Sequence, residues 1–245
     1  MLKLIQIEFM KLRRKKLMWI MMLAALVMPF FAFMYFHYFG ETGVAPAEFY
    51  RWSAFGYTLF IILPFVLGML CTMLMHDELR YDMLKQLWIV PVSRLGYFFS
   101  KFFVVLTYSI CFMLITAIAS VLFSVLPGYV VFDWESVFFL LKTCLEVALF
   151  SALAMLPILA IAASQKGYVL PVCITLIYVF AGFFIVPINT YLHPISSTSV
   201  IISRSRGIPG LTFPQPVSVP SALICICVWG IVAVLLANMT LRRRK

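Results

Sequence analysis

Long apolar runs recur along the chain, and each is long enough to cross a lipid bilayer. Five of them lack Lys, Arg, Asp and Glu over 20 to 25 residues: Leu17–Phe39, Ser53–Met75, Phe102–Leu126, Tyr168–Pro187 and Val217–Leu241. An α-helix needs about 20 apolar residues to cross ~30 Å of hydrocarbon. The pattern predicts a polytopic membrane protein, with residues 1–245 forming a single transmembrane domain.

A sixth apolar run lies between the third and fourth of these. Ser136–Ser164 is interrupted only by Lys142 and Glu146. As one helix it would reach ~43 Å, so we expect its first turns to lie in the outer interface or to form a re-entrant helix. The predicted fold is all-α, with six spans at residues 17–39, 53–75, 97–126, 143–164, 168–187 and 217–241.

The first sixteen residues predict an amphipathic helix in the membrane interface. Leu2, Ile5, Phe9 and Leu12 recur at helical spacing. The basic residues that would anchor it to lipid phosphates are Lys11, Arg13, Arg14, Lys15 and Lys16. A plain basic flank that only fixes orientation is a compatible interpretation.

Residues 76–91, between the second and third spans, also predict an amphipathic helix. The apolar face holds Leu79, Met83, Leu84 and Leu87; the polar face holds Asp77, Glu78, Arg80, Asp82, Lys85 and Gln86. Pro91 ends the helix. The pattern fits docking into a soluble partner or lying on lipid equally well.

Residues 188–216 contain four prolines, too many breakers for one helix, and are expected to form an extracellular loop.

Basic residues determine the predicted orientation. With the N-terminus in the cytoplasm and six spans, 15 Lys and Arg lie inside and 4 lie outside. This bias predicts that both termini are cytoplasmic. The chain is 64% hydrophobic and 11% charged, with a net charge of +10. Because the basic residues flank apolar runs, the expected partner of this charge is anionic membrane lipid, and no nucleic acid is expected.

Common nucleotide-binding and catalytic motifs are missing from the sequence. It contains no phosphate-binding loop, no H-E-x-x-H motif and no G-x-S-x-G elbow. The six cysteines fall in or beside apolar runs, where thiols behave as small hydrophobic groups. The three histidines are scattered, so no metal site and no cofactor of its own are expected.

Two further features concern the spans themselves. Lys142 and Glu146 have i, i+4 spacing and form a candidate charged pair at the outer face; an interfacial anchor is the alternative role. Pro64 and Pro157 lie within the second and fourth spans, where each removes a backbone hydrogen bond and permits a kink.

Two segments resemble ABC-2-type transporter permeases. Residues 75–101 are similar to that family's first cytoplasmic loop, which has an acidic residue, a helix, a Leu-rich turn, Pro-x-Ser-Arg and a Lys that opens span three. The matching residues are Glu78, Leu84, Leu87, Pro91, Ser93, Arg94 and Lys101. Asp82-Met83 stands where the family usually has Gly-Thr. Residues 5–14 resemble the family's interfacial helix, and the size and texture are most like lantibiotic or bacitracin-immunity permeases.

The resemblance implies a function. Two permease subunits, identical or homologous, would sit over two ATPase subunits that bind ATP and Mg²⁺. The helix at 76–91 would couple them through Asp77, Glu78, Asp82, Leu84, Leu87, Pro91 and Arg94. Spans one, two and five would move, and a hydrophobic or amphipathic ligand, such as an antimicrobial peptide, would be expelled from the bacterial cytoplasmic membrane.

Two other classes of function stay open. A membrane enzyme acting on a lipid-linked substrate, such as a polyprenyl pyrophosphate, would use clustered polar groups at one face of the membrane. His193, Arg204 and Arg206 form a small candidate cluster of this kind. A regulatory or scaffold subunit without a conduit is the third class.

Overall fold

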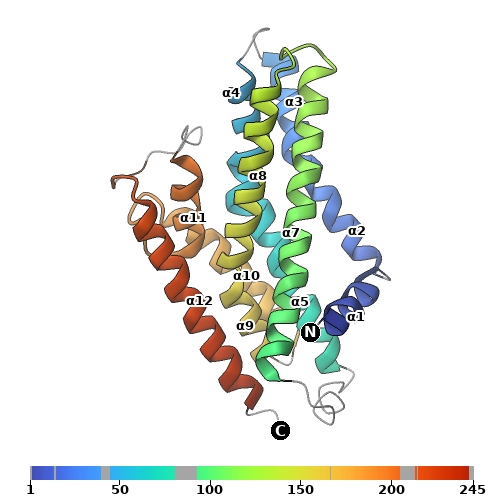
Figure 1. The fold of residues 1–245 in the computed structure, drawn as a ribbon, viewed down its shortest axis with the longest axis vertical. Coiled ribbons are helices and arrows are strands. Elements are labelled where there is room, and N and C mark those ends of the chain that lie inside the picture. Colours follow the sequence, from blue (N-terminus) through green and yellow to red (C-terminus); the bar gives the residue numbers. More distant parts are fainter. Residues whose placement is uncertain are drawn as a thin grey trace.

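The protein is a bundle of helices in a computed structural model that describes residues 2–13, 15–39, 45–80, 93–165, 167–204, 213 and 215–242. Within these ranges the regular elements are all helical (Figure 1). Five helical segments are long and apolar enough to cross a membrane: Lys16–Phe39, Pro46–His76, Arg94–Val125, Trp134–Ser164 and Val219–Arg242. A helix satisfies its backbone hydrogen bonds internally, which hydrocarbon demands. The prediction of an all-α membrane protein with several spans is therefore confirmed.

The first span is preceded by a separate helix. α1 (Leu2–Arg13) ends one turn before α2 (Lys16–Leu23), and a 3₁₀ turn then leads into α3 (Val27–Phe39). The side of α1 that is buried against the bundle carries Glu8 and Leu12, whereas Phe9 is 39% exposed. The inward face of α1 is therefore partly polar, which the apolar periodicity alone did not predict.

The second span contains two π-helical turns. α4 (Pro46–Tyr50) leads into η2 (Arg51–Phe55) and η3 (Thr58–Ile62), and α5 (Leu63–Arg80) completes the span. Pro64 is the second residue of α5, directly after the second π turn. Proline lacks the N–H that a regular helix would use there, so the irregular turns coincide with its expected effect.

The third and fourth spans form a long helical hairpin. α7 (Arg94–Val125) and α8 (Trp134–Ala154) are joined through Gly128, whose φ of 77° is accessible to glycine at little cost. Ser109 Oγ donates to Ala148 O over 2.9 Å and ties the two helices together. α8 is continuous from Trp134 to Ala154. Its first turns therefore extend the span and do not form a separate re-entrant helix. The helix is interrupted at Met155, and Pro157 follows in the first turn of α9 (Leu156–Ser164). This interruption agrees with the kink predicted at Pro157.

The C-terminal part is built of three helices. α10 (Val169–Phe184) has 16 residues, α11 (Pro194–Ser203) has 10, and α12 (Val219–Arg242) has 24. α10 would span only ~24 Å, less than the other candidates. α11 lies inside the segment expected to be an extracellular loop, and all of its residues are buried against its neighbours, α8, α10 and α12.

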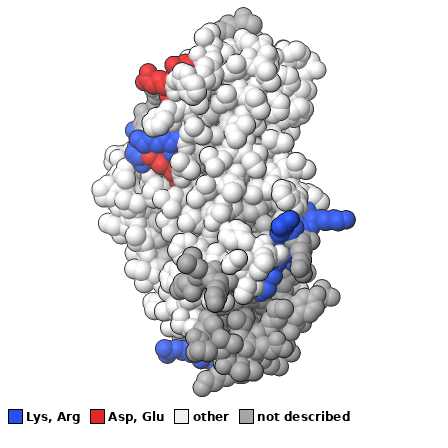
Figure 2. All heavy atoms as spheres, turned by 45° about the vertical axis from the view of Figure 1, so that its right-hand side comes forward, with Lys and Arg blue, Asp and Glu red and all other residues white. Residues whose placement is uncertain are grey.

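Large apolar side chains also cover the outside of the bundle. Trp19, Phe31, Ile177 and Leu235 are each 57% or more exposed. Figure 2 shows one side of the molecule, where the surface is mostly uncharged and Lys and Arg lie in a few places. An apolar exterior of this extent fits a lipid environment and would be a liability in water.

Candidate functional site

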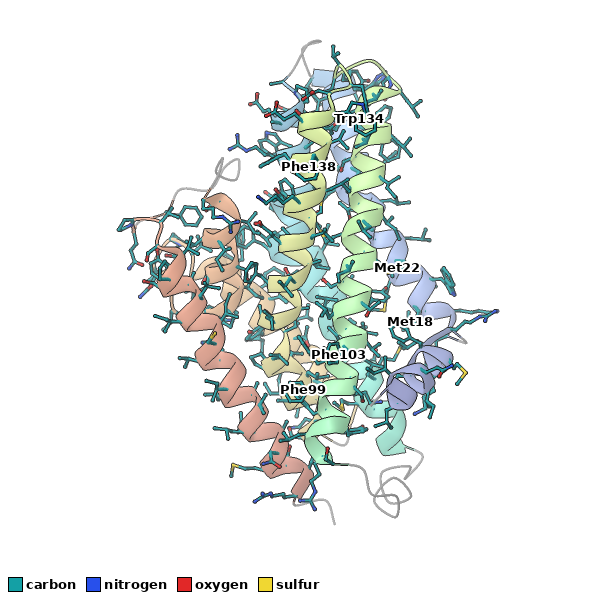
Figure 3. All side chains as sticks on the ribbon, viewed as in Figure 1. Met18, Met22, Phe99, Phe103, Trp134 and Phe138 are labelled. Carbon is teal, nitrogen blue, oxygen red and sulfur yellow. The ribbon has the colours of Figure 1, made fainter. Side chains whose placement is uncertain are left out.

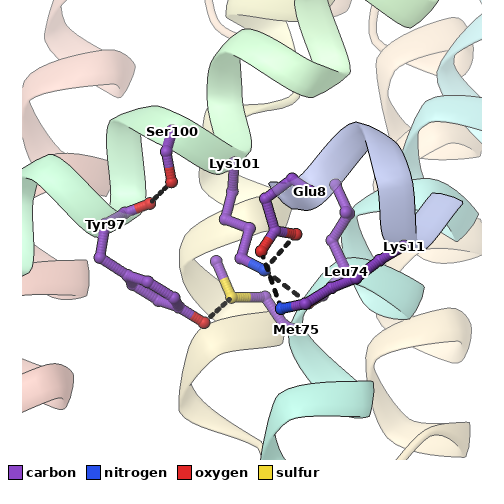
Figure 4. A network of polar contacts seen from close by, with 7 residues as sticks. All are labelled: Glu8, Lys11, Leu74, Met75, Tyr97, Ser100 and Lys101. Carbon is purple, nitrogen blue, oxygen red and sulfur yellow. Dashed lines mark hydrogen bonds and ion pairs between the residues drawn. The ribbon is translucent and has the colours of Figure 1, made fainter. Parts of the chain in front are cut away.

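The best-defined polar site lies where the segment between the second and third spans joins the bundle. The end of α5 and the start of α7 meet there, and α1 lies against α7 (Figure 4). Figure 1 shows that α12 also ends in this lower part of the bundle. The site therefore sits at the base of the segment expected to contact a partner.

A buried ion pair connects α1 to α7. Lys101 Nζ lies 2.6 Å from Glu8 Oε2, and the two residues are 0% and 5% exposed. Lys101 also donates to the carbonyl of Leu74, near the end of α5, over 3.3 Å. A buried ammonium group is stable only when it is paired and hydrogen-bonded. These contacts thus fix three elements relative to one another.

Further contacts support this ion pair. Lys101 Nζ lies 5.2 Å from the centre of the Tyr97 ring, within the range of a cation–π interaction. The Tyr97 hydroxyl donates to Met75 Sδ over 3.8 Å, and Ser100 Oγ donates to the Tyr97 carbonyl over 2.7 Å. The end of α5 is therefore connected to the first turns of α7 through both Lys101 and Tyr97.

Among the described side chains, two further lysines lie near Glu8. Lys11 Nζ lies 3.1 Å from Glu8 Oε1. Burial, and then the positive charge of Lys101, lower the pKa of Lys15, while Glu8 acts in the opposite direction. The Glu8 carboxylate thus interacts with three ammonium groups of the described residues, those of Lys11, Lys15 and Lys101.

A second ion pair lies farther along the bundle, between α8 and the end of α11. Arg204 Nη2 lies 2.8 Å from Glu146 Oε1, and Arg204 Nη1 donates to the carbonyl of Ile201 over 3.3 Å. Lys142 is exposed on the same helix as Glu146. The ion pair found for Glu146 is therefore to Arg204, and a functional Lys142–Glu146 pair stays a prediction.

The candidate cluster for lipid-linked chemistry is not assembled among the described residues. His193 is 5% exposed, its Nδ1 accepts from the backbone N–H of Ile195, and burial lowers its pKa to about 4. Arg204 is engaged by Glu146, and Arg206 lies outside the described residues. The described residues also bring together no group of three His, Cys, Asp or Glu side chains that could hold a metal ion.

The family is indicated by the sequence that builds this site. Residues 4–182 match the profile of a family described as ABC-2 family transporter protein. The chain belongs to the ABC-2 transporter family. The match covers more than half of the chain and includes both Glu8 and Lys101. No curated protein matches the chain significantly.

Membership has direct consequences for the biochemical class. An ABC-2 family member is a multi-pass transmembrane subunit of an ABC transporter, which works with an ABC ATPase. The protein is accordingly assigned as a transporter component.

The residues predicted to contact the ATPase are only partly described in this ABC-2 protein. Asp77 and Glu78 lie in the last turns of α5, and nothing is described of their side chains. Asp82, Leu84, Leu87 and Pro91 lie outside the described residues, as does the expected helix beyond Arg80. Arg94 is the half-buried first residue of α7, and Ser93 caps that helix by accepting from Gly96 N over 3.1 Å. The Pro-x-Ser-Arg sequence thus supplies the N-cap of the third span.

The predicted anchor residues follow the corner between α1 and α2. Lys11 and Lys15 are half-buried, Arg13 and Lys16 are exposed, and Arg14 lies outside the described residues. Glu8 was not among the predicted site residues, although the sequence held a signal. It is the only acidic residue before Glu41, and it lies on a helix next to an apolar bundle. A single acidic residue in such a place is expected to pair with a basic residue. Lys101, which directly precedes the third apolar run, is a basic residue in a comparable position.

Proposed function

We propose that this protein is the membrane subunit of an ATP-driven exporter that removes an amphipathic compound, such as an antimicrobial peptide, from the bacterial cytoplasmic membrane. Two copies of a separate ATPase would bind ATP and Mg²⁺, and a second permease subunit, identical or homologous, would complete the transporter. The observation that carries the proposal is the buried Glu8–Lys101 pair, in a chain of the ABC-2 family. The pair lies where residues 76–91, the proposed coupling segment, join the bundle.

The geometry supports mechanical coupling through this junction. A push on residues 76–91 would reach the bundle through the end of α5 and the start of α7. Because Lys101 contacts both Glu8 and the Leu74 carbonyl, these elements would move together with α1. A rigid connection of this kind transmits a displacement, whereas separate helices would absorb it.

An apolar cavity supports the proposed class of ligand. A cavity of about 480 Å³ lies between α3 and the π-helical part of the second span. Tyr35 and Trp52 stack at its edge with their ring centroids 6.4 Å apart, and Phe31, Ala32 and Tyr57 contribute to its lining. Aromatic and aliphatic walls bind the apolar part of an amphipathic molecule.

The proposed topology places six spans in the membrane with both termini in the cytoplasm. The sixth span is the short helix α10, in addition to the five long segments. Basic residues at the end of α12 and around α1 support this arrangement through the positive-inside bias.

The test measures coupling in the purified complex. The tagged full-length chain is expected to bring down a soluble ATPase whose MgATP hydrolysis rises when an amphipathic peptide is added. Reversing two charges, with Glu78→Lys and Asp82→Lys, should abolish this stimulation while leaving the amount of protein in the membrane unchanged. Glu135→Lys, an exposed change at the far end of α8, is the matched control. Undiminished stimulation in the double variant would refute docking through this segment.

A further inference from the structure

A narrow apolar groove lies at the corner where α1 turns into the first span. Its cavity has a volume of about 210 Å³ and lies between α1, α2 and α7. Figure 3 shows Met18 and Met22 on α2, on the side where this helix runs beside α7. The main lining residues are Phe9, Leu12, Met18, Met22, Val104 and Tyr108.

The walls of the groove are mainly apolar and suit a hydrocarbon group. Two hydroxyl groups lie in its lining, and both already donate to backbone carbonyls. Tyr108 Oη donates to Met18 O over 3.1 Å, and Thr107 Oγ1 donates to Phe103 O over 2.9 Å. The rest of the lining is aliphatic, aromatic or sulfur-containing, apart from the Arg13 guanidinium group and the Trp19 indole N–H.

Positive charge surrounds one end of this groove. Arg13 contributes to the lining, and Lys16 begins α2; both are exposed. The sequence from residue 8 to residue 16 holds five basic residues and a single acid, Glu8, which is bound by Lys101 and Lys11. Figure 2 shows basic side chains gathered on this side of the molecule, beside a wide uncharged surface. A ligand with an anionic head and an apolar tail matches both parts.

We propose that this groove is a binding site for one anionic glycerophospholipid. An acyl chain lies between α2 and α7, and the phosphate lies beside Arg13 and Lys16. Basic pockets at the ends of membrane helices recognise anionic headgroups in this way. The bound lipid braces α1 against α7, because Phe9 and Leu12, which line the groove, follow Glu8 within about one turn of the same helix. This site is independent of the compound that is transported.

The experiment uses Trp19, which lines the groove and is 67% exposed. The full-length chain carries four other tryptophans, at 52, 88, 134 and 229, and each is replaced by Phe. The protein is reconstituted in phosphatidylcholine vesicles that contain acyl-brominated phosphatidylglycerol or, separately, acyl-brominated phosphatidylcholine. At a low mole fraction, brominated phosphatidylglycerol should quench Trp19 severalfold more strongly. Equal quenching by the two lipids would overturn the proposal.

Variants separate the headgroup from the acyl chain. Arg13→Gln with Lys16→Gln should remove the preference for phosphatidylglycerol, whereas Arg242→Gln at the end of α12 should retain it. Cys111→Phe, which narrows the groove, should reduce quenching; Cys173→Phe, also at an exposed cysteine, should not. Unchanged quenching in both groove variants would contradict the site.

Two controls address free phosphate and misfolding. Soluble glycerol phosphate should leave the quenching unchanged, and displacement by it would show that the site recognises free phosphate and not a lipid. If the single-tryptophan protein does not fold, the phospholipids retained by the purified wild-type chain are measured. The ratio of phosphatidylglycerol to phosphatidylcholine should then fall severalfold in Arg13→Gln/Lys16→Gln, and an unchanged ratio would overturn the proposal.

Discussion

At the scale of single residues, the buried pair Glu8–Lys101 links α1 to α7 near the end of α5. Lys101 has no exposed surface and lies 2.6 Å from Glu8. Lys101→Met should lower the free energy of unfolding by about 3 kcal/mol, because removing one partner leaves the other charge buried. Unfolding in mixed micelles of increasing detergent strength measures the change.

A double-mutant cycle separates the pair from its surroundings. Glu8→Gln combined with Lys101→Met should cost less than the sum of the single changes, with a coupling of about 1–3 kcal/mol. The same cycle on Glu146 and Arg204, which are partly exposed, should give less than about 1 kcal/mol. Equal coupling at both sites would show that burial of Glu8–Lys101 has no energetic consequence.

His193 predicts a pH dependence of stability. Its pKa in the folded protein is about 4 because of burial, against 6.5 for an ordinary histidine. As the pH falls, the unfolded chain therefore takes up this proton first. The contribution to stability is complete above about pH 6.5 and decreases toward pH 4, reaching a loss of about 2 kcal/mol at pH 5.

Thermal unfolding of the purified protein between pH 7.5 and 5 tests this expectation. His193→Asn keeps a residue that can cap α11 but does not titrate, so its unfolding temperature should change less over this range. A variant as sensitive to pH as the wild type would assign the effect to another group.

At the scale of elements, close packing between α5 and α10 depends on a glycine. A Cβ atom at Gly68 would overlap the Thr175 side chain on α10. Gly68→Ala should therefore destabilise the protein by about 1–3 kcal/mol, despite the better helix propensity of alanine.

Gly230 on α12 is the matched control. A Cβ there would meet Leu156 Cδ1 at 3.6 Å, an ordinary contact. Gly230→Ala should be neutral or slightly stabilising in the same unfolding assay. If both variants behave alike, the contact between α5 and α10 is not tightly packed.

Uninterrupted apolar runs predicted that long helices form, since a helix in hydrocarbon is recognisable from its own residues; the second begins at Pro46, before the predicted residue 53. Lys16–Phe39 and Val219–Arg242 lie within two residues of the predicted spans at both ends. Trp134 begins its helix earlier than the predicted span because Asp133 caps it, accepting from the N–H groups of Glu135 and Ser136. α11 was missed because its Ser-rich sequence resembles a loop. Its hydroxyl groups are satisfied by nearby carbonyls, as when Ser197 Oγ donates to Thr190 O over 3.1 Å.

At the scale of the whole molecule, the proposed topology predicts which loops a membrane-impermeant thiol reagent reaches. The six cysteines are first replaced, and single cysteines are then introduced at Lys85 and Lys142. In intact cells, only the cysteine at position 142 should be labelled; in inverted vesicles, only the one at 85. Labelling of position 85 from outside would reverse the orientation and exclude ATPase docking at 76–91.

The sequence by itself determined that this chain is an all-helical membrane protein with basic residues before its first span, because helices that lie in lipid are built from long apolar runs. It also carried the family resemblance between spans two and three. Only the tertiary structure decided that Glu8 meets Lys101 and that Glu146 meets Arg204, since the partners are 93 and 58 residues apart. The same holds for the groove between α1, α2 and α7. Contacts over such separations depend on how the helices pack, and packing is a property of the whole bundle.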